Sequence, residues 1–204
     1  GEFRLCGVTA GVGGSFFFYE CLRELAFLCR DFRELQIVGG NMRRREQREH
    51  IFKLLFISEF NTQKEMEEQL ALYLADIENL EESDRDYISR KYMNIMNHTD
   101  ELDEKLNSIS MGWKTSRMNR VDLTVLRLAV YELEYEKEEV PVGVAINEAV
   151  ELAKCFGSEE SGAFVNGILG KIANPDKKVA ARKASSKKPL GTVLASFFIQ
   201  HITA

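Results

Sequence analysis

The stretch Val140–Leu169 constrains the fold of this chain more than any other part of the sequence. Apolar residues recur at helical spacing on both sides of a polar corner, where Gly157 is followed by Ser158 and two glutamates. Pro141 favours a helix that begins next to it, because its fixed φ and missing N–H cost little in a first turn. We expect Gly157 to end the first helix in the left-handed conformation and Ser158 to cap the second. The stretch therefore predicts two helices that meet at a tight corner.

Three residues in these predicted helices are poor choices on propensity. Asn147 and Asn166 lie in helix interiors, where asparagine is unfavourable, and Gly167 costs about 1 kcal/mol relative to alanine. One interpretation is that the asparagines are tolerated on the surface and that Gly167 permits close helix packing. The other is that a function keeps these residues in place.

The segments Ala-Ile-Asn-Glu-Ala at 145–149 and Phe-Val-Asn-Gly at 164–167 resemble the carboxyl-terminal signature of the bacterial NusB family of transcription antitermination factors. The match extends back through residues 120–122 and 126–133 to an arginine-rich start at 43–49, and it covers roughly 42–173. The resemblance implies an all-α fold, a compact bundle of about six to seven helices. Residues 1–41 and 174–204 would then be amino- and carboxyl-terminal extensions.

Apolar periodicity predicts further helices at 43–60, 64–80, 83–106 and 121–133. Asn119 is placed to cap the last of these. Nearly every position of that helix is apolar, so we expect it to be buried on most sides. Arg127 is the exception, and a buried guanidinium requires a compensating charge, so we predict a carboxylate partner with Glu148 as the candidate.

Charge is distributed unevenly along the chain. The net charge of −5 comprises −1 in residues 1–41, +5 in 174–204 and therefore −9 in 42–173. Any nucleic-acid contact of so acidic a domain has to be confined to a patch. Four arginines, at positions 43, 44, 45 and 48, open a helix against its dipole, which favours a phosphate-contacting patch. The alternative is a solvated helix start, offset by Glu46 and Glu49.

Phe56 lies eight residues after Arg48, so both can share one helix face and Phe56 could stack a base. Taken alone, it is interpreted as a core residue. The family resemblance implies that the chain binds the boxA element of nascent ribosomal RNA transcripts together with NusE, a small-subunit ribosomal protein. Other Nus factors would join this assembly to elongating RNA polymerase.

The resemblance also assigns roles to individual residues. The RNA-binding residues it implies are Arg43, Arg44, Arg45, Arg48, Lys53, Phe56, Glu160, Phe164 and Asn166. Asp122 matches a position on the partner-binding side. The sequence departs from the family pattern at Ala163, where a basic residue is frequent, and at Gly170, where an acidic or amide residue is common.

Two other classes of function remain open. A NusB-like domain can be a helical protein-interaction module that binds no RNA, and such domains also occur fused to RNA-modifying enzymes. No enzyme signature is present here: His50, His98 and His201 are widely spaced, and no two cysteines form a C-x-x-C pair. We therefore predict neither a catalytic site nor a metal or other cofactor. Homodimerisation, known in some family members, is left open.

The two ends lie outside the resemblance. We interpret residues 1–41 as a non-family extension, with a start assigned upstream of Met42 and a vector origin both open. Residues 174–204 are interpreted as a basic, disordered tail. The apolar run at 190–202 has about 13 residues, fewer than the ~20 that span a membrane, and residues 8–18 make a poor signal peptide. We therefore expect a cytoplasmic protein with no membrane contact.

Overall fold

The computed structural model describes residues 42–109 and 114–174, and this part of the chain is built from helices without any strand. The elements are α2 (Arg44–Ser58), α3 (Gln63–Ala75), α4 (Glu82–Asn97), α5 (Thr99–Ile109), the 3-10 helix η2 (Thr115–Arg117), α6 (Arg120–Tyr135), α7 (Val142–Phe156) and α8 (Ser161–Ala173). The all-α prediction of six to seven helices is confirmed. The predictions for residues 1–41 and for the tail beyond residue 174 fall outside the described residues.

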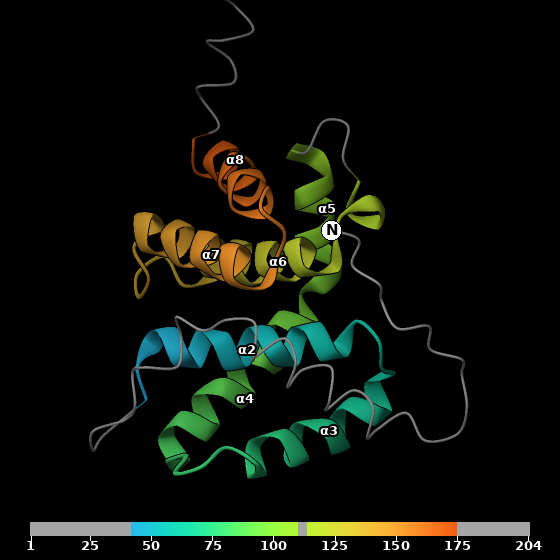
Figure 1. The fold of residues 1–204 in the computed structure, drawn as a ribbon, viewed down its shortest axis with the longest axis vertical. Helices are drawn as coiled ribbons and strands as arrows, with labels where there is room; N and C mark the ends of the chain where they lie inside the picture. The colour runs from blue at the N-terminus through green and yellow to red at the C-terminus, as the bar shows by residue number, and fades with distance from the viewer. Residues whose placement is uncertain (1–41, 110–113, 175–204) are drawn as a thin grey trace, which may run out of the picture.

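Helix α6 holds the bundle together. It packs against α2, α4, α5, α7 and α8, and every residue from Val121 to Leu133 except Arg127 is buried, as the apolar run predicted. Figure 1 shows α7 and α8 at one end of the bundle and α2, α3 and α4 at the other. None of the described helices is long and apolar enough to cross a membrane.

The helix ends follow local chemistry only in part. Asn119 caps α6 as predicted, since its Oδ1 accepts the N–H of Val121 at 3.0 Å. The predicted helix at 83–106 is instead two helices, because the helical backbone is interrupted at His98 (φ −106°, ψ 9°). Hydrogen bonds from the His98 N–H and the Thr99 hydroxyl to the carbonyl of Ile95 compete with the helical ladder there. Apolar periodicity continues across the break and does not reveal it.

The corner between α7 and α8 forms, but its chemistry differs from the prediction. Gly157 has φ −99°, so the left-handed conformation is wrong. Glycine is needed there for space: a Cβ would lie 2.5 Å from Ser161 Oγ and 2.6 Å from the carbonyl oxygen of Ala153. Helix α8 begins at Ser161 rather than after Ser158, because Ser161 Oγ accepts the Ser158 N–H at 2.9 Å. Close packing at Gly167 is also wrong, since a Cβ there would meet no atom within 4 Å.

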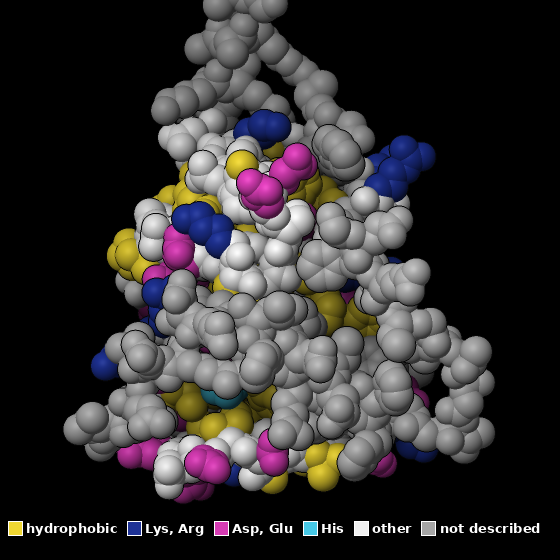
Figure 2. Space-filling view, in the orientation of Figure 1, with side chains coloured by type: hydrophobic (Ala, Val, Ile, Leu, Met, Phe, Trp, Pro, Cys, Tyr) yellow, Lys and Arg dark blue, Asp and Glu magenta, His cyan; other side chains and the backbone are white. Residues whose placement is uncertain are grey.

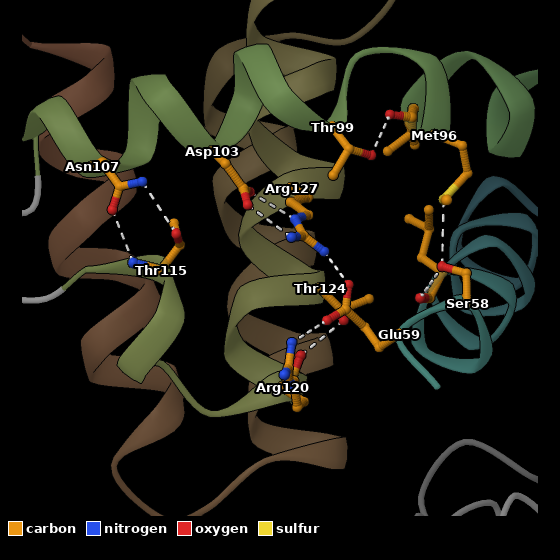
Figure 3. Close-up of polar contacts among 12 residues, drawn as sticks. Ser58, Glu59, Met96, Thr99, Asp103, Asn107, Thr115, Arg120, Thr124 and Arg127 are labelled. Carbon is orange, nitrogen blue, oxygen red and sulfur yellow. Dashed lines mark hydrogen bonds and ion pairs between the residues drawn. The ribbon is translucent and has the colours of Figure 1, made fainter. Parts of the chain in front are cut away.

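Arg127 has carboxylate partners, but Glu148 is not one of them. Its Nε and Nη2 donate to the two carboxylate oxygens of Asp103 at 2.7 and 2.8 Å, and its Nη1 donates to Glu59 (Figure 3). Glu59 follows α2 directly and Asp103 lies on α5, so Arg127 ties both helices to α6. Glu148 lies on α7, so the prediction chose a carboxylate on a different neighbour of α6 from those that the guanidinium contacts.

Candidate nucleic-acid interface

The N-cap residue of α2 and the first two residues of the helix form what we call the arginine patch at the surface: Arg43, Arg44 and Arg45. Arg43 and Arg44 are exposed and Arg45 is half-buried. The Arg44 guanidinium lies 4.5 Å from the centre of the Tyr87 ring, and its Nη1 donates to Gln47 at 3.2 Å. In Figure 2, a small dark-blue group is visible at the left edge near the start of α2, and magenta acidic side chains spread along the lower edge. A ring and an amide thus orient Arg44 toward solvent.

Arg48, one turn further on, lies inside the protein. Its side chain is only 8% exposed, and its Nε donates to Glu132 at 2.8 Å. Lys91 donates to the same Glu132 oxygen at 2.6 Å and to Glu136 at 2.6 Å. We call Arg48, Lys91, Glu132 and Glu136 the Glu132 network. Its members come from α2, α4 and α6, and Glu136 directly follows α6. The network therefore fixes α2 on the core.

Tyr87 of α4 joins the Glu132 network to the arginine patch. Lys91 Nζ donates to its hydroxyl at 3.3 Å, while Arg44 lies over its ring. Burial alone would lower the pKa of Lys91, but the charges of Glu132, Tyr87 and Glu136 outweigh it, and the pKa lies above its ordinary value. Lys91 therefore stays charged at neutral pH. The sequence reasoning missed both Tyr87 and Glu132, although a glutamate within the apolar run 121–133 was a readable signal.

Lys53 and Phe56 occupy the next turns of α2. Lys53 is half-buried, paired with Glu49 at 2.5 Å and 6.0 Å from the centre of the Phe156 ring. Phe56 is also half-buried and packs against the core. Its ring stacks on Phe52 at 6.1 Å between centroids and meets Phe60 edge-on at 5.3 Å. Phe56 therefore supports the core on one side and retains an accessible part that can meet a ligand.

The remaining predicted residues lie around the corner between α7 and α8. Glu160 and Asn166 are exposed, and Phe164 is half-buried. Asp122 is 8% exposed, and Oδ1 of its carboxylate is buried without a hydrogen-bond partner among the described residues. Burial raises its pKa, partly offset by a hydrogen bond with Ser161. The structure thus gives Asp122 little surface for direct contact and places it where it can position the start of α8.

A cleft of about 500 Å³ lies between α7 and α8. Its lining residues are Gly143, Ile146, Asn147, Val150, Glu151, Lys154, Gly162, Ala163 and Asn166. It brings together the two unfavourable asparagines that the sequence singled out. Among residues 42–109 and 114–174, no group of three or more His, Cys, Asp or Glu side chains could hold a metal ion.

Comparison with known proteins gives consistent matches. The model of the NusB family matches residues 45–174. A protein of Agathobacter rectalis described as transcription antitermination protein NusB is 48% identical over 132 residues, which are 65% of this chain and 100% of that protein. The protein of the same description from Lachnoclostridium phytofermentans is 45% identical over 131 residues, 64% of this chain and 98% of that one.

Solved structures match as well. A structure of NusB from T. maritima is 37% identical with a TM-score of 0.61, covering 66% of this chain and 93% of that one. A crystal structure of the antitermination factors NusB and NusE in complex with double-stranded RNA contains a chain 25% identical with a TM-score of 0.53. That match covers 65% of this chain and 96% of the other.

Proposed function

The chain belongs to the NusB family of transcription antitermination proteins, and from this premise we propose that it binds boxA RNA of nascent ribosomal RNA transcripts together with NusE. The solved complex of a related NusB with NusE and RNA supports both kinds of partner. The observation that carries the proposal is the arginine patch. Residues 42–173 have a net charge of −9, yet Arg43, Arg44 and Arg45 gather at one helix start, and a ring and an amide orient Arg44.

The proposed RNA-binding residues make two kinds of contact, one with phosphates and one with bases. Arginine-patch guanidiniums, with Lys53, neutralise phosphates, which gives affinity with little dependence on sequence. Phe56 offers ring surface to an unstacked base, a contact typical of single-stranded RNA recognition. Glu160, Phe164 and Asn166 complete the site from the carboxyl-terminal corner.

Arg48 and Asp122 enter the proposal as positioning residues. Each is buried, Arg48 against Glu132 and Asp122 beside Ser161, so each acts through the element it fixes. Arg48 holds the helix that presents the arginine patch, and Asp122 holds the start of α8.

The same proposal extends to the transcription complex. The acidic remainder of the domain suits a basic ribosomal protein such as NusE, because opposite charge favours encounter. Through NusE and other Nus factors, the bound RNA would be tethered to elongating RNA polymerase in the cytoplasm.

The salt dependence of RNA binding tests the proposal. For single-stranded RNA, each phosphate contact contributes roughly −0.7 to the slope of log affinity against log salt. We expect Arg44→Ala with Arg45→Ala to weaken binding of a boxA oligonucleotide and to flatten this slope by about one unit or more. Lys64→Ala, which removes an exposed cation near the start of α3, is the control and should leave the slope unchanged.

The alternative function is a protein-interaction module without RNA binding. It would be supported if the unaltered chain showed no affinity for the boxA oligonucleotide at low salt. An equal slope in the double variant and the unaltered protein would show that the arginine patch is only a solvated helix start.

A further inference from the structure

We propose that the cleft between α7 and α8 holds one unstacked base of the bound single-stranded RNA, and that Asn147 reads the edge of that base. This inference rests on the proposed RNA-binding function and extends its carboxyl-terminal corner from Asn166 into the cleft. Asn147 is then a specificity-determining residue, distinct from the phosphate contacts of the arginine patch.

The cleft has the volume of a ligand site and is open to solvent, since most of its lining residues are exposed. Its volume of about 500 Å³ lies within the range of about 300–1,000 Å³ found for small-ligand pockets. The half-buried Ile146 and Val150 contribute apolar surface. Gly143 keeps one side open, because a Cβ there would meet no atom within 4 Å. An aromatic base fits such a mixture of apolar surface and free space.

Two amides from facing helices supply the polar groups. Asn147 of α7 and Asn166 of α8 are both exposed and both line the cleft, and neither side chain makes a hydrogen bond within the described residues. An amide presents a donor and an acceptor side by side, the pattern that matches a base edge. Asparagine is unfavourable in a helix interior, and both amides are exposed without a hydrogen bond among the described residues, so both are available to a ligand.

Lys154 supplies a cation at the cleft. Its stem crosses α8 at Gly162, where a Cβ would lie 2.9 Å from Lys154 Cγ, so glycine at this position leaves room for the lysine. Lys154 Nζ pairs with Glu151 at 2.7 Å, but this pair is exposed and contributes little to stability. The ammonium can therefore turn to the phosphate of the nucleotide whose base occupies the cleft.

A double-mutant cycle between protein and RNA tests the assignment. The full chain is titrated with a boxA oligonucleotide and with a series in which each base in turn is removed as an abasic nucleotide. At one position, we expect base removal to weaken binding by about 5-fold to 150-fold. Asn147→Ala should weaken binding of the intact RNA to a similar extent, without changing the salt slope, and should abolish the further loss at that single position.

Filling the cleft gives a second, independent test. Gly143→Leu places a side chain where the base would lie, whereas Gly170→Leu adds the same side chain to α8 at a position that is equally open but does not line the cleft. We expect Gly143→Leu to weaken RNA binding to about the same degree as Asn147→Ala. Gly170→Leu should bind as the unaltered protein does, and circular dichroism should show that both variants keep their helices.

Failure of this inference is distinguishable from failure of the proposed function. If Asn147→Ala and Gly143→Leu bind every oligonucleotide as tightly as the unaltered protein, while the arginine-patch variant loses affinity, the chain binds RNA but the cleft does not. A uniform loss across the abasic series, or a flatter salt slope, would also overturn the base-reading role of Asn147. If the unaltered chain bound no RNA at all, both this inference and the proposed function would be wrong.

Discussion

Arg44 and Arg48 are separated by one turn of α2 and have different roles. Arg44 lies at the surface over the Tyr87 ring, whereas Arg48 is buried against Glu132. Both have the same residue type, the same helix and nearly the same sequence context. Residues four apart lie on nearly the same face of a helix, so what each side chain meets along α2 decides its role. Arg48 meets the buried Glu132 of α6, whereas Arg44, one turn nearer the helix start, lies over Tyr87 and remains available to RNA.

The same division separates the Glu132 network from two exposed polar regions, the arginine patch and the α7–α8 cleft. Charges inside a protein are costly unless paired, so removing one partner destabilises the fold strongly. Charges outside are screened and contribute little to stability, but they can bind phosphate. Variants of the interior should therefore alter unfolding, and variants of the exposed regions should alter RNA affinity.

Removing Glu132, the carboxylate that Arg48 and Lys91 share, should lower the free energy of unfolding more than any of the other substitutions. Glu132→Ala leaves Arg48 without its carboxylate and Lys91 with Glu136 alone, and we expect it to lower the free energy of unfolding by about 3–5 kcal/mol. Denaturant titration measures this change. Glu138→Ala, at an exposed site, is the control and should stay within about 0.5 kcal/mol. Similar stabilities for the two variants would show that the interior charges do not hold α2 in place.

Acid should lower the free energy of unfolding because His50 then becomes protonated. Burial lowers its pKa to about 4, with a further contribution from the charge of Lys53. Because the unfolded chain binds this proton near pH 6.5, stability from the neutral ring is complete above that pH and is lost as pH falls toward 4. The loss from this group should reach about 3 kcal/mol.

Comparing the unaltered protein with His50→Gln isolates this effect, because the other titrating groups are common to both. The difference in unfolding free energy between the two proteins should narrow from pH 7 to pH 4. A constant difference over that range would contradict a lowered pKa of His50.

The sequence predicted what depends on local pattern and missed what depends on pairing across helices. Periodicity located α2, α6 and α7, and the apolar run 121–133 correctly indicated a buried helix. The same reasoning required a carboxylate for Arg127 but chose Glu148 over Asp103 and Glu59, because periodicity does not tell which neighbouring helix a side chain faces. For the candidate site, it identified the exposed arginines but could not separate Arg48 from them.

Disrupting the half-buried ion pairs of Arg127 should cause a loss of stability between that expected in the Glu132 network and that expected at the surface. Asp103→Asn removes the charge from two hydrogen bonds to that guanidinium while leaving Glu59 in place. Fully buried charged hydrogen bonds contribute about 1.5–3 kcal/mol each to stability, and Asp103 is partly exposed, so we expect a loss of about 1–2 kcal/mol. Thermal or denaturant unfolding measures it, with the exposed Asp100→Asn on the same helix as control. A loss as large as that of Glu132→Ala would show that the ion pairs of Arg127 contribute as much to stability as the buried Glu132 network.

The smallest change in stability is expected at Lys154, which sharpens the comparison most because Lys91 is its interior counterpart. Both lysines pair with glutamate at similar distances, 2.7 Å for Lys154 with Glu151 and 2.6 Å for Lys91 with Glu132. The side chain of Lys154 is 59% exposed and that of Lys91 only 2%. Lys154→Met should therefore change the free energy of unfolding by less than about 0.5 kcal/mol, whereas Lys91→Met should destabilise the protein by several times as much.

RNA binding should separate the two lysines in the reverse sense. If Lys154 contacts a phosphate at the cleft, Lys154→Met flattens the salt slope by roughly 0.7, the value of one contact with a single strand. Lys91→Met, compared under conditions where it remains folded, should leave that slope unchanged, because its ammonium is enclosed by Glu132 and Glu136. A slope that changed for Lys91 and not for Lys154 would reverse the comparison, since the buried charge would then be the one that meets RNA.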